Sequence, residues 1–532
     1  TEIEEKLAEL WSEVLGADRI GVHDSFFERG GHSLKVTRLV TLIHKELSVK
    51  LSYRDIFEKP TIRSLAVHIG EVEQERFVSI PPAPPAAYYP LSYAQNRMFI
   101  QQQIYPDSTS YNISLVYLVQ GRLDKPKIAE TFNRLAQRHE SLRTCFTLVQ
   151  NSPVQRILDR VELGFEEYSC PEEQLEPVIH RLIRPFNLER APLLRAGLVQ
   201  VGSDRHVLVL DMHHIVADGM SVDLIAADFF AMYAGDELPK LPIHYKDYAV
   251  WEQSRERKEL AKKQETYWLD VFFRPVQPLE LPIDYPRDFG VQDSEAAIAS
   301  FVLDADWTAK VRDLAFRHQV SLYVLLLAVY NVLLAKCCGQ EDIVVGTVTS
   351  GRNHDDLKQV VGMFANTIPQ RNFPAKHKTF FQFLQEVHDN ALQGFQHQEY
   401  PLEKLVNRLN LKRDLNRNPL FDTFFQIQYF EERQQEIGEL LFTPYPYRKN
   451  NTSQFELELS VEEEQERLQF HLHYSSQLYK RETIESLWDA YYEALQKVIG
   501  DEHIQLGDMR LSVEPRPSED MIKLSESIQF NF

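Results

Sequence analysis

The feature that most constrains this chain is the segment MHHIVADGMS at residues 212–221, which continues directly from the apolar run HVLVLD. That run contains alternating β-branched residues, as a buried strand does. The sequence MSVDLIAADFFAMY, which follows Gly219, repeats apolar residues at helical spacing. We therefore predict a tight loop between a buried strand and a helix, with His213 and His214 where the strand ends.

The two adjacent histidines have several possible roles. Catalytic groups concentrate on loops held by a rigid scaffold, and a histidine there can act as base, acid or hydrogen-bond donor near neutral pH. The alternatives are a purely structural histidine and a metal ligand. Neighbouring side chains on an extended chain point to opposite faces, and no third ligand follows at a familiar zinc spacing. A metal site is therefore disfavoured.

Six further segments accompany the pattern HHxxxDG. SYAQNRMF (92–99) and RHESLRTCF (138–146) precede it, and YKDYAVW (245–251) follows. The second half of the chain adds VGMFANTIPQR (361–371), HQEYPLEK (397–404) and RDLNRNPLFD (413–422). In content and order these segments resemble the condensation domains of nonribosomal peptide synthetases, within the wider family of chloramphenicol acetyltransferase. The resemblance covers about residues 91–510 and identifies this region as a condensation domain.

The resemblance implies an α/β fold with two chloramphenicol-acetyltransferase-like lobes, which we place at residues 91–260 and 261–515. The apolar stretch at 320–335 is too short for a membrane span and is predicted to be a buried helix. Residues 341–352 should then form a strand and loop, giving a βα-type pattern. Residues 516–532 are expected to be a tail or linker.

The N-terminal 75 residues carry a second signature. DSFFERGGHSLK (24–35) resembles the phosphopantetheine attachment motif of peptidyl carrier proteins, with Ser33 as the modified residue. Apolar residues at helical spacing predict helices near 1–16, 33–47 and 61–74, with a short one around 54–57. We expect a small all-α four-helix bundle here.

Ser33 is predicted at the start of the second helix, where a serine is often only an N-cap. The resemblance instead implies that 4'-phosphopantetheine is attached covalently to Ser33. A phosphodiester there would meet the free N–H groups and the positive end of the helix dipole. The glycines before it, Gly30 and Gly31, leave the hydroxyl accessible and permit positive φ angles.

Bulk properties set limits on partners and compartment. The net charge of −20 argues against nucleic acid and anionic membranes as partners. The four cysteines form no disulfide framework and no signal peptide opens the chain, so we expect a cytoplasmic protein with reduced thiols. The chain starts on a helix without methionine, as an excised piece of a synthetase would. Five prolines at 76–90 predict a semi-rigid linker that restricts, without fixing, the orientation of the two units.

The resemblance also implies roles within the HHxxxDG loop. His214 is the expected central group, which either accepts a proton from the attacking amine or orients that amine and stabilises the tetrahedral intermediate. His213 is expected to be a structural partner. Asp218 should form an ion pair that holds the loop, with Arg143 as first and Arg97 as second candidate. Gly219 would allow close backbone approach and present an N–H. Further site candidates are Asn366, Trp251 and Ser350.

The implied reaction joins two carrier-bound thioesters, as in antibiotic biosynthesis, with the upstream carrier presenting the donor. The partners implied are an upstream adenylation domain, downstream adenylation and carrier domains and a phosphopantetheinyl transferase, and the chain is expected to be monomeric. Two alternatives are an epimerisation domain, which shares HHxxxDG, and a catalytically silent recruitment module, which would lose that loop. A heterocyclisation domain is disfavoured because it replaces the histidine pair.

Overall fold

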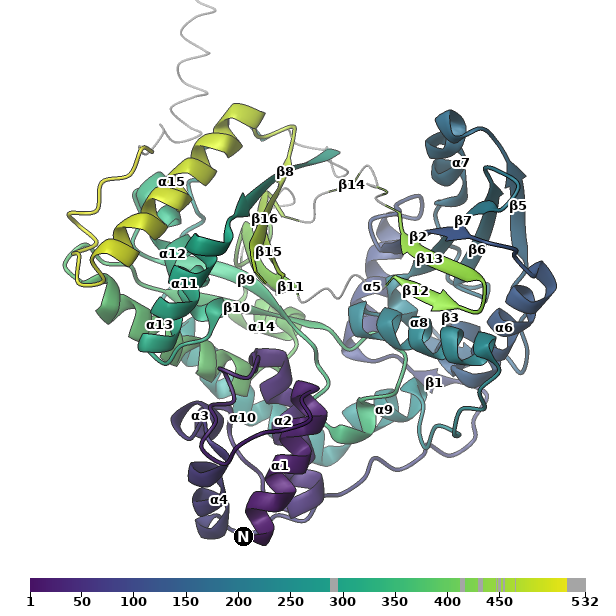
Figure 1. Ribbon diagram of the computed structural model, residues 1–532, viewed down its shortest axis with the longest axis horizontal. Helices are drawn as coiled ribbons and strands as arrows, with labels where there is room; N and C mark the ends of the chain where they lie inside the picture. Colours follow the sequence, from purple (N-terminus) through teal and green to yellow (C-terminus); the bar gives the residue numbers. More distant parts are fainter. Residues whose placement is uncertain are drawn as a thin grey trace, which may run out of the picture.

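The computed structural model describes residues 1–287, 295–411, 417–428, 434–445, 447, 451–452, 455–464 and 466–513, with the side chains of Ser33, Leu34, Glu295, Asn451 and Thr452 left out. A small helical bundle lies beneath two larger lobes, with the first lobe at the right of Figure 1 and the second at the left. The predicted tail at 516–532 and part of the segment at 413–422 lie outside the described residues.

The N-terminal bundle contains α1 (Glu2–Leu15), α2 (Ser33–Leu47), α3 (Tyr53–Glu58) and α4 (Ile62–Glu71). Thr1 caps α1 with a capping box, and Gly16 ends it in the left-handed conformation. Trp11 and Phe26 are fully buried and meet edge to face with ring centroids 5.0 Å apart. The predicted bundle of three main helices and one short helix is confirmed.

The first lobe is built on a six-stranded sheet. Its strands, in spatial order, are β12 (Gln435–Ile437), β13 (Leu440–Pro444), β2 (Asn112–Gln120), β7 (Arg205–His213), β6 (Leu194–Gln200) and β5 (Phe165–Ser169). Alternate residues of β7 face opposite sides: Leu208 and Leu210 pack in the core of α6 (Lys125–Arg138) and α8 (Gly219–Ala234). Val207 and Val209 pack against α7 (Leu175–Leu182). Helices therefore cover both faces of β7.

The first lobe also contains a small sheet, one further helix and two 3-10 turns. A small sheet has the order β1 (Tyr89–Pro90), β4 (Ser152–Ile157), β3 (Thr144–Val149). The helix α5 (Tyr93–Ile104) precedes β2, and the short 3-10 turns η1 (Glu140–Arg143) and η2 (Glu172–Gln174) precede β3 and α7. The helices α9 (Tyr245–Glu252) and α10 (Arg255–Val271) lead toward the second lobe.

The second lobe repeats the sheet-and-helix layering. Its strands, in spatial order, are β10 (Asn366–Asn372), β9 (Ile343–Thr349), β11 (Thr423–Gln428), β15 (Leu457–Glu463), β16 (Leu468–Ser475), β8 (Glu295–Leu303) and β14 (Asn451–Thr452). One face packs against α11 (Ala305–Arg317), α12 (Leu322–Cys338), α13 (Phe380–Gln396) and α15 (Arg481–Gly500). The short α14 (Leu402–Leu409) packs with α10. The expected α/β two-lobed fold is confirmed, as is the buried helix at 320–335 followed by a strand.

Two features depart from a simple division into lobes. The strands β12 and β13 come from the second half of the chain, but β13 pairs with β2 and β12 pairs with β13, so both strands extend the first sheet. The linker at 76–90 is extended, as predicted, but it packs on the lobes: Ile80 is buried, and Ala83 N donates to Asp247 Oδ1 at 2.8 Å. The linker is therefore held against the condensation domain at these two residues, and that it restricts without fixing the orientation of the two units stays a prediction.

Among the described residues, no single helix is long and apolar enough to cross a membrane. The helices α11 and α12 pass that test only as a pair, and they bend by 102° where they meet.

Candidate functional site

The HHxxxDG loop lies where β7 ends and α8 begins, as predicted. The 3-10 turn η3 (His214–Val216) separates the two elements, and His214 N donates to Tyr111 O at 2.7 Å. Asp218 is the N-cap of α8 and accepts from Ser221 N at 2.8 Å through Oδ1. The loop is therefore held by the backbone at its start and by a cap at its end.

The two histidines differ in their surroundings. His213 is fully buried, its Nδ1 accepts from Ile215 N at 3.1 Å, and its Nε2 lies 3.2 Å from Gln102 Oε1. His214 is partly exposed, and no described residue offers a hydrogen-bond partner to its buried Nδ1. Burial lowers the pKa of His214 below its ordinary value, although Asp218 opposes this. The His213 ring is thus enclosed by these two neighbours, and the lowered pKa of His214 leaves that ring neutral at pH 7.

Asp218 is buried and pairs with Arg352, not with the arginines expected from the sequence. Its Oδ1 accepts from Arg352 Nη2 at 3.1 Å, and its Oδ2 accepts from Phe364 N at 3.0 Å. Burial alone would raise the pKa of Asp218, but Arg352 and these hydrogen bonds hold it below its ordinary value. A carboxylate with a lowered pKa stays ionised at neutral pH and binds a proton weakly, which disfavours a role as a base.

The expectation that Arg143 or Arg97 pairs with Asp218 is wrong. Arg143 lies at the end of η1, where its Nη2 is 3.4 Å from Glu140 Oε1. Arg97 on α5 reaches across to α14, with Nη1 3.2 Å from Glu403 Oε1. Arg352 pairs with Asp218 because the loop after β9 brings Arg352 to the N-terminal end of α8. No local sequence pattern predicts this long-range placement. Sequence reasoning missed Arg352 although it stands two residues from the candidate Ser350.

The loop at 350–365 carries Arg352 from the second lobe into the first. Gly351 has a φ of +65°, and a Cβ at this position would lie only 1.9 Å from Phe364 O, so only glycine fits here. Arg352 Nη1 donates to the carbonyls of Leu357 and Val360 at 2.6 and 2.7 Å. The guanidinium therefore closes the loop on one side and holds the aspartate of the HHxxxDG loop on the other.

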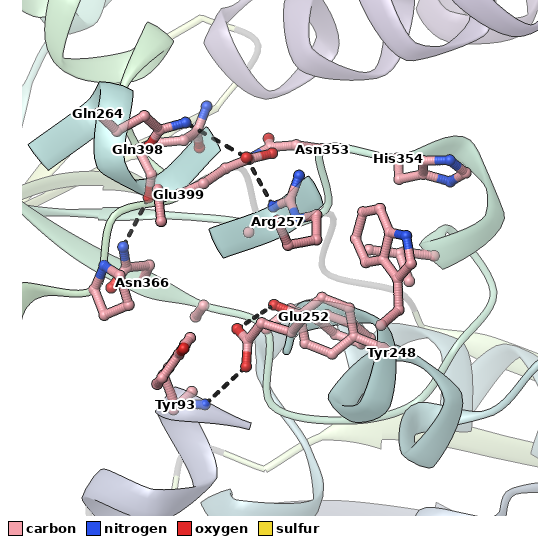
Figure 2. Close-up of a pocket in the computed structure, with 18 of the residues that line it drawn as sticks. Tyr93, Tyr248, Glu252, Arg257, Gln264, Asn353, His354, Asn366, Gln398 and Glu399 are labelled. Carbon is pink, nitrogen blue, oxygen red and sulfur yellow. Dashed lines mark hydrogen bonds and ion pairs between the residues drawn. The ribbon is translucent and has the colours of Figure 1, made fainter. Parts of the chain in front are cut away.

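A pocket opens between α5, α9, α10 and the loop at 350–365 (Figure 2). Glu252 accepts from Tyr93 N at 2.9 Å and from the hydroxyl of Tyr248 at 2.9 Å, and burial raises its pKa. Arg257 donates to Glu399 Oε2 at 2.8 Å. Arg97, which also lines the pocket, lies near enough to His214 to disfavour its protonation. The pocket and the histidine loop therefore share Arg97.

The weaker candidates are distributed around this pocket. Asn366 lines it and donates through Nδ2 to the carbonyls of Gln398 and Tyr400 at 2.7 and 3.1 Å. Trp251 lines it with its ring 4.4 Å from the guanidinium of Arg257. Ser350 Oγ accepts from Arg352 N at 3.4 Å.

Gly219 is exposed in the first turn of α8. A Cβ built on Gly219 would have no atom of the described residues within 4 Å, apart from its own chain neighbours and helix backbone. The sequence named none of Glu252, Arg257 or Glu399, because isolated charges carry no local signal.

Ser33 is the first residue of α2, and His32 occupies the N-cap position. A plain N-cap role for Ser33 is therefore wrong, while its place at the positive end of a helix is as predicted. Gly30 has φ +87°, and Gly31 is needed because a Cβ would lie 2.2 Å from the ring of Phe26. The N-terminal end of α2, which has no side-chain cap, suits a phosphodiester attached to Ser33.

Comparison with known proteins agrees with this organisation. Residues 86–519 match the condensation domain family, and residues 5–69 match the family described as a phosphopantetheine attachment site. Tyrocidine synthase 3 of Brevibacillus parabrevis is 41% identical over 513 residues, which make up 96% of this chain and 8% of that protein. Gramicidin S synthase 2 of Brevibacillus brevis is 40% identical over 528 residues, 99% of this chain and 12% of that protein. The chain thus spans only a small part of these curated relatives.

Solved structures share the fold. The X-domain from teicoplanin biosynthesis superposes with a TM-score of 0.75 at 24% identity, covering 82% of this chain and 100% of that one. The condensation domain of the Monacolin K polyketide synthase MokA gives a TM-score of 0.69 at 22% identity, covering 79% and 99%. The chain therefore belongs to the condensation-domain family of nonribosomal peptide synthetases, with a phosphopantetheine attachment domain preceding the condensation domain.

Proposed function

We propose that this chain forms a peptide bond between two carrier-bound thioesters, with the donor on the carrier domain at residues 1–75. The observation that carries this proposal is the intact HHxxxDG loop, in which a neutral His214 is partly exposed while Asp218 is locked by Arg352. A recruitment module without chemistry would have no use for this arrangement.

His214 is the proposed catalytic group. As the acceptor amine attacks the donor carbonyl, an N–C bond forms, the C–S bond breaks and the nitrogen loses a proton. A neutral imidazole can accept that proton, or it can orient the amine and stabilise the charge that develops on oxygen. Gly219, at the N-terminal end of α8, presents a backbone N–H beside the loop. His213 and Asp218 hold His214 in place and do not exchange protons with substrate.

Ser33 is the proposed attachment site for 4'-phosphopantetheine. When bound, the group supplies a flexible thiol arm that holds the donor as a thioester. The N-terminal end of α2 offers free backbone N–H groups and a positive dipole to the phosphate. Tethering raises the effective concentration of donor at the condensation domain. Holding the amine and carbonyl in line would supply much of the rate.

The proposed partners follow from this division of labour. An upstream adenylation domain would charge the carrier, downstream adenylation and carrier domains would supply the acceptor, and a phosphopantetheinyl transferase would modify Ser33. The chain would act as a cytoplasmic monomer, joined to these domains within one synthetase.

One assay tests the proposal against its alternatives. Ser33 is loaded with an aminoacyl group, a charged acceptor carrier is added, and the products are separated by mass spectrometry and chiral chromatography. We expect a dipeptidyl thioester on the acceptor carrier. An inverted donor stereocentre without transfer would instead show epimerisation, and unchanged thioesters would show a silent module. The His214→Ala protein, loaded in the same way, is the control for uncatalysed transfer.

A further inference from the structure

The turn from Arg352 to Leu357, which we call the 352–357 turn, has two sides with different partners. On one side Arg352 binds Asp218 of the HHxxxDG loop. On the other side its acidic and aromatic residues bind the carrier domain and the linker. The 3-10 turn η4 (Asp355–Leu357) forms its second half.

The carrier contact is an ion pair. Lys45, in the last turn of α2, places Nζ 2.5 Å from Asp355 Oδ2, and Asp355 is only 2% exposed. Lys358 lies 3.5 Å from the other carboxylate oxygen. The carrier lysine is therefore the closer of the two cations that neutralise this buried carboxylate.

The linker also contacts the 352–357 turn, through residues 77–80. The Phe77 ring lies between two histidine rings, with its centroid 4.5 Å from that of His354 and 5.4 Å from that of His44 on α2. His354 Nε2 lies 3.1 Å from Val78 O. Two residues further on, Ile80 N donates to Asp356 Oδ2 at 2.9 Å.

The same turn is rigidly connected to the catalytic loop. Arg352 spans the turn by donating to the carbonyls of Leu357 and Val360, and its Nη2 also donates to Ser221 Oγ at 2.9 Å. Ile80 of the linker packs in one apolar cluster with Leu357 and Phe364, and the backbone of Phe364 binds Asp218. Few bonds therefore separate the linker from the cap of α8.

We propose that the 352–357 turn is a docking surface for the carrier and linker whose occupation also stiffens the HHxxxDG loop. Contacts that hold the turn from the carrier side restrict the movement of Arg352 on the catalytic side, and because coupling between two sites is reciprocal, the Arg352–Asp218 pair in turn favours the docked carrier. Disengaging the carrier should then loosen the loop around His214. The inference adds a link between carrier docking and catalysis, and it rests on the proposed function only where turnover is measured.

Hydrogen exchange of the unloaded full chain tests this link without any reaction. Phe77→Ala removes the ring contact with His354, and Lys45→Met removes the ion pair with Asp355. Two neighbouring variants are the controls. Val78→Ala changes a residue that is 72% exposed, and Lys50→Met changes a surface lysine that pairs with Glu75. In the first two variants we expect amides at 214–222 to exchange roughly fivefold faster, the lower end of ordinary coupling between sites. The two controls should exchange as the parent does.

The outcome that overturns the proposal is equally specific. If amides at 352–357 exchange faster in Phe77→Ala and Lys45→Met while those at 214–222 do not, docking and the catalytic loop are independent. Should Phe77→Ala not fold, Phe77→Leu and the surface variant Lys45→Met provide the same comparison.

Turnover gives a second readout. In a Ser33→Ala background, a soluble aminoacyl thioester serves as donor, so delivery from the carrier plays no part. Phe77→Ala should lower kcat on this donor severalfold, and Val78→Ala should not; an unchanged kcat for Phe77→Ala would contradict the coupling. If the parent protein makes no amide from any donor, the proposed function fails, while the exchange result still decides the coupling.

Discussion

Arg352 donates a hydrogen bond to Asp218 across 134 positions of sequence, from the second lobe of the condensation domain to the first. Both side chains are buried, and the pair fixes the loop that carries His213 and His214. A buried ion pair contributes little net stability when intact, but the loss of one partner leaves an uncompensated charge. The pair therefore makes the integrity of the site depend on the two lobes remaining together.

The first prediction compares Asp218→Ala with His214→Ala. Removal of Asp218 leaves the charge of Arg352, a residue that is 6% exposed, without its carboxylate partner and should cost about 3–5 kcal/mol. Loss of the partly exposed His214 should change stability by roughly 1 kcal/mol or less while abolishing turnover. Calorimetric unfolding of both proteins, with Asp218→Asn as a variant that keeps the N-cap, checks this order. A normal melting curve for Asp218→Ala would count against the structural role.

The second prediction concerns Ser33. Since Ser33 is the first residue of α2 and not its cap, Ser33→Ala should change stability by no more than about 0.5 kcal/mol. It should nevertheless abolish modification by a phosphopantetheinyl transferase with coenzyme A. Intact-protein mass spectrometry measures the increment, and Thr41→Ala on the same helix is the control. A phosphopantetheine increment on the Ser33→Ala protein would refute the assignment.

The third prediction is a pH dependence. Burial lowers the pKa of His214 below 6.5, so the ring stays neutral as the pH falls through that value. The unfolded chain, whose histidines titrate near 6.5, binds the proton first, and folding is therefore destabilised as the pH falls below about 6.5. NMR spectra of protein labelled with 13C-histidine measure this pKa. The resonance of His214 is assigned as the one absent from the spectrum of His214→Gln, and its titration midpoint should lie below pH 6.5. A midpoint at or above 6.5 would contradict the burial of this ring.

The fourth prediction concerns stereochemistry and is a hypothesis from domain order. Only residues 72–88 lie between α4 of the carrier and β1 of the condensation domain, too few for an intervening epimerase. The donor residue would therefore reach the site uninverted, and the donor site should prefer an L-configured residue. Transfer rates from Ser33 loaded with matched L- and D-aminoacyl groups, to one acceptor, measure this preference. Faster transfer from the D-donor would show that it is wrong.

The sequence alone determined the features that depend on short-range patterns. The alternation in 206–211 and the helical spacing after Gly219 predict β7 and α8, because period and side-chain burial are linked within each element. The bundle at residues 1–75 and the buried helix at 320–335 follow for the same reason. The motifs, being contiguous, also identified Ser33 and the two histidines as candidates.

Tertiary structure decided the features that depend on which distant segments meet. Arg352, not Arg143 or Arg97, pairs with Asp218 because the loop after β9 crosses between the lobes, and several arginines were equally plausible by charge alone. The addition of β12 and β13 to the first sheet and the anchoring of Phe77 beside His354 are likewise long-range. Such contacts are selected by the shape and polarity of surfaces that exist only after the chain has folded, so no local period encodes them.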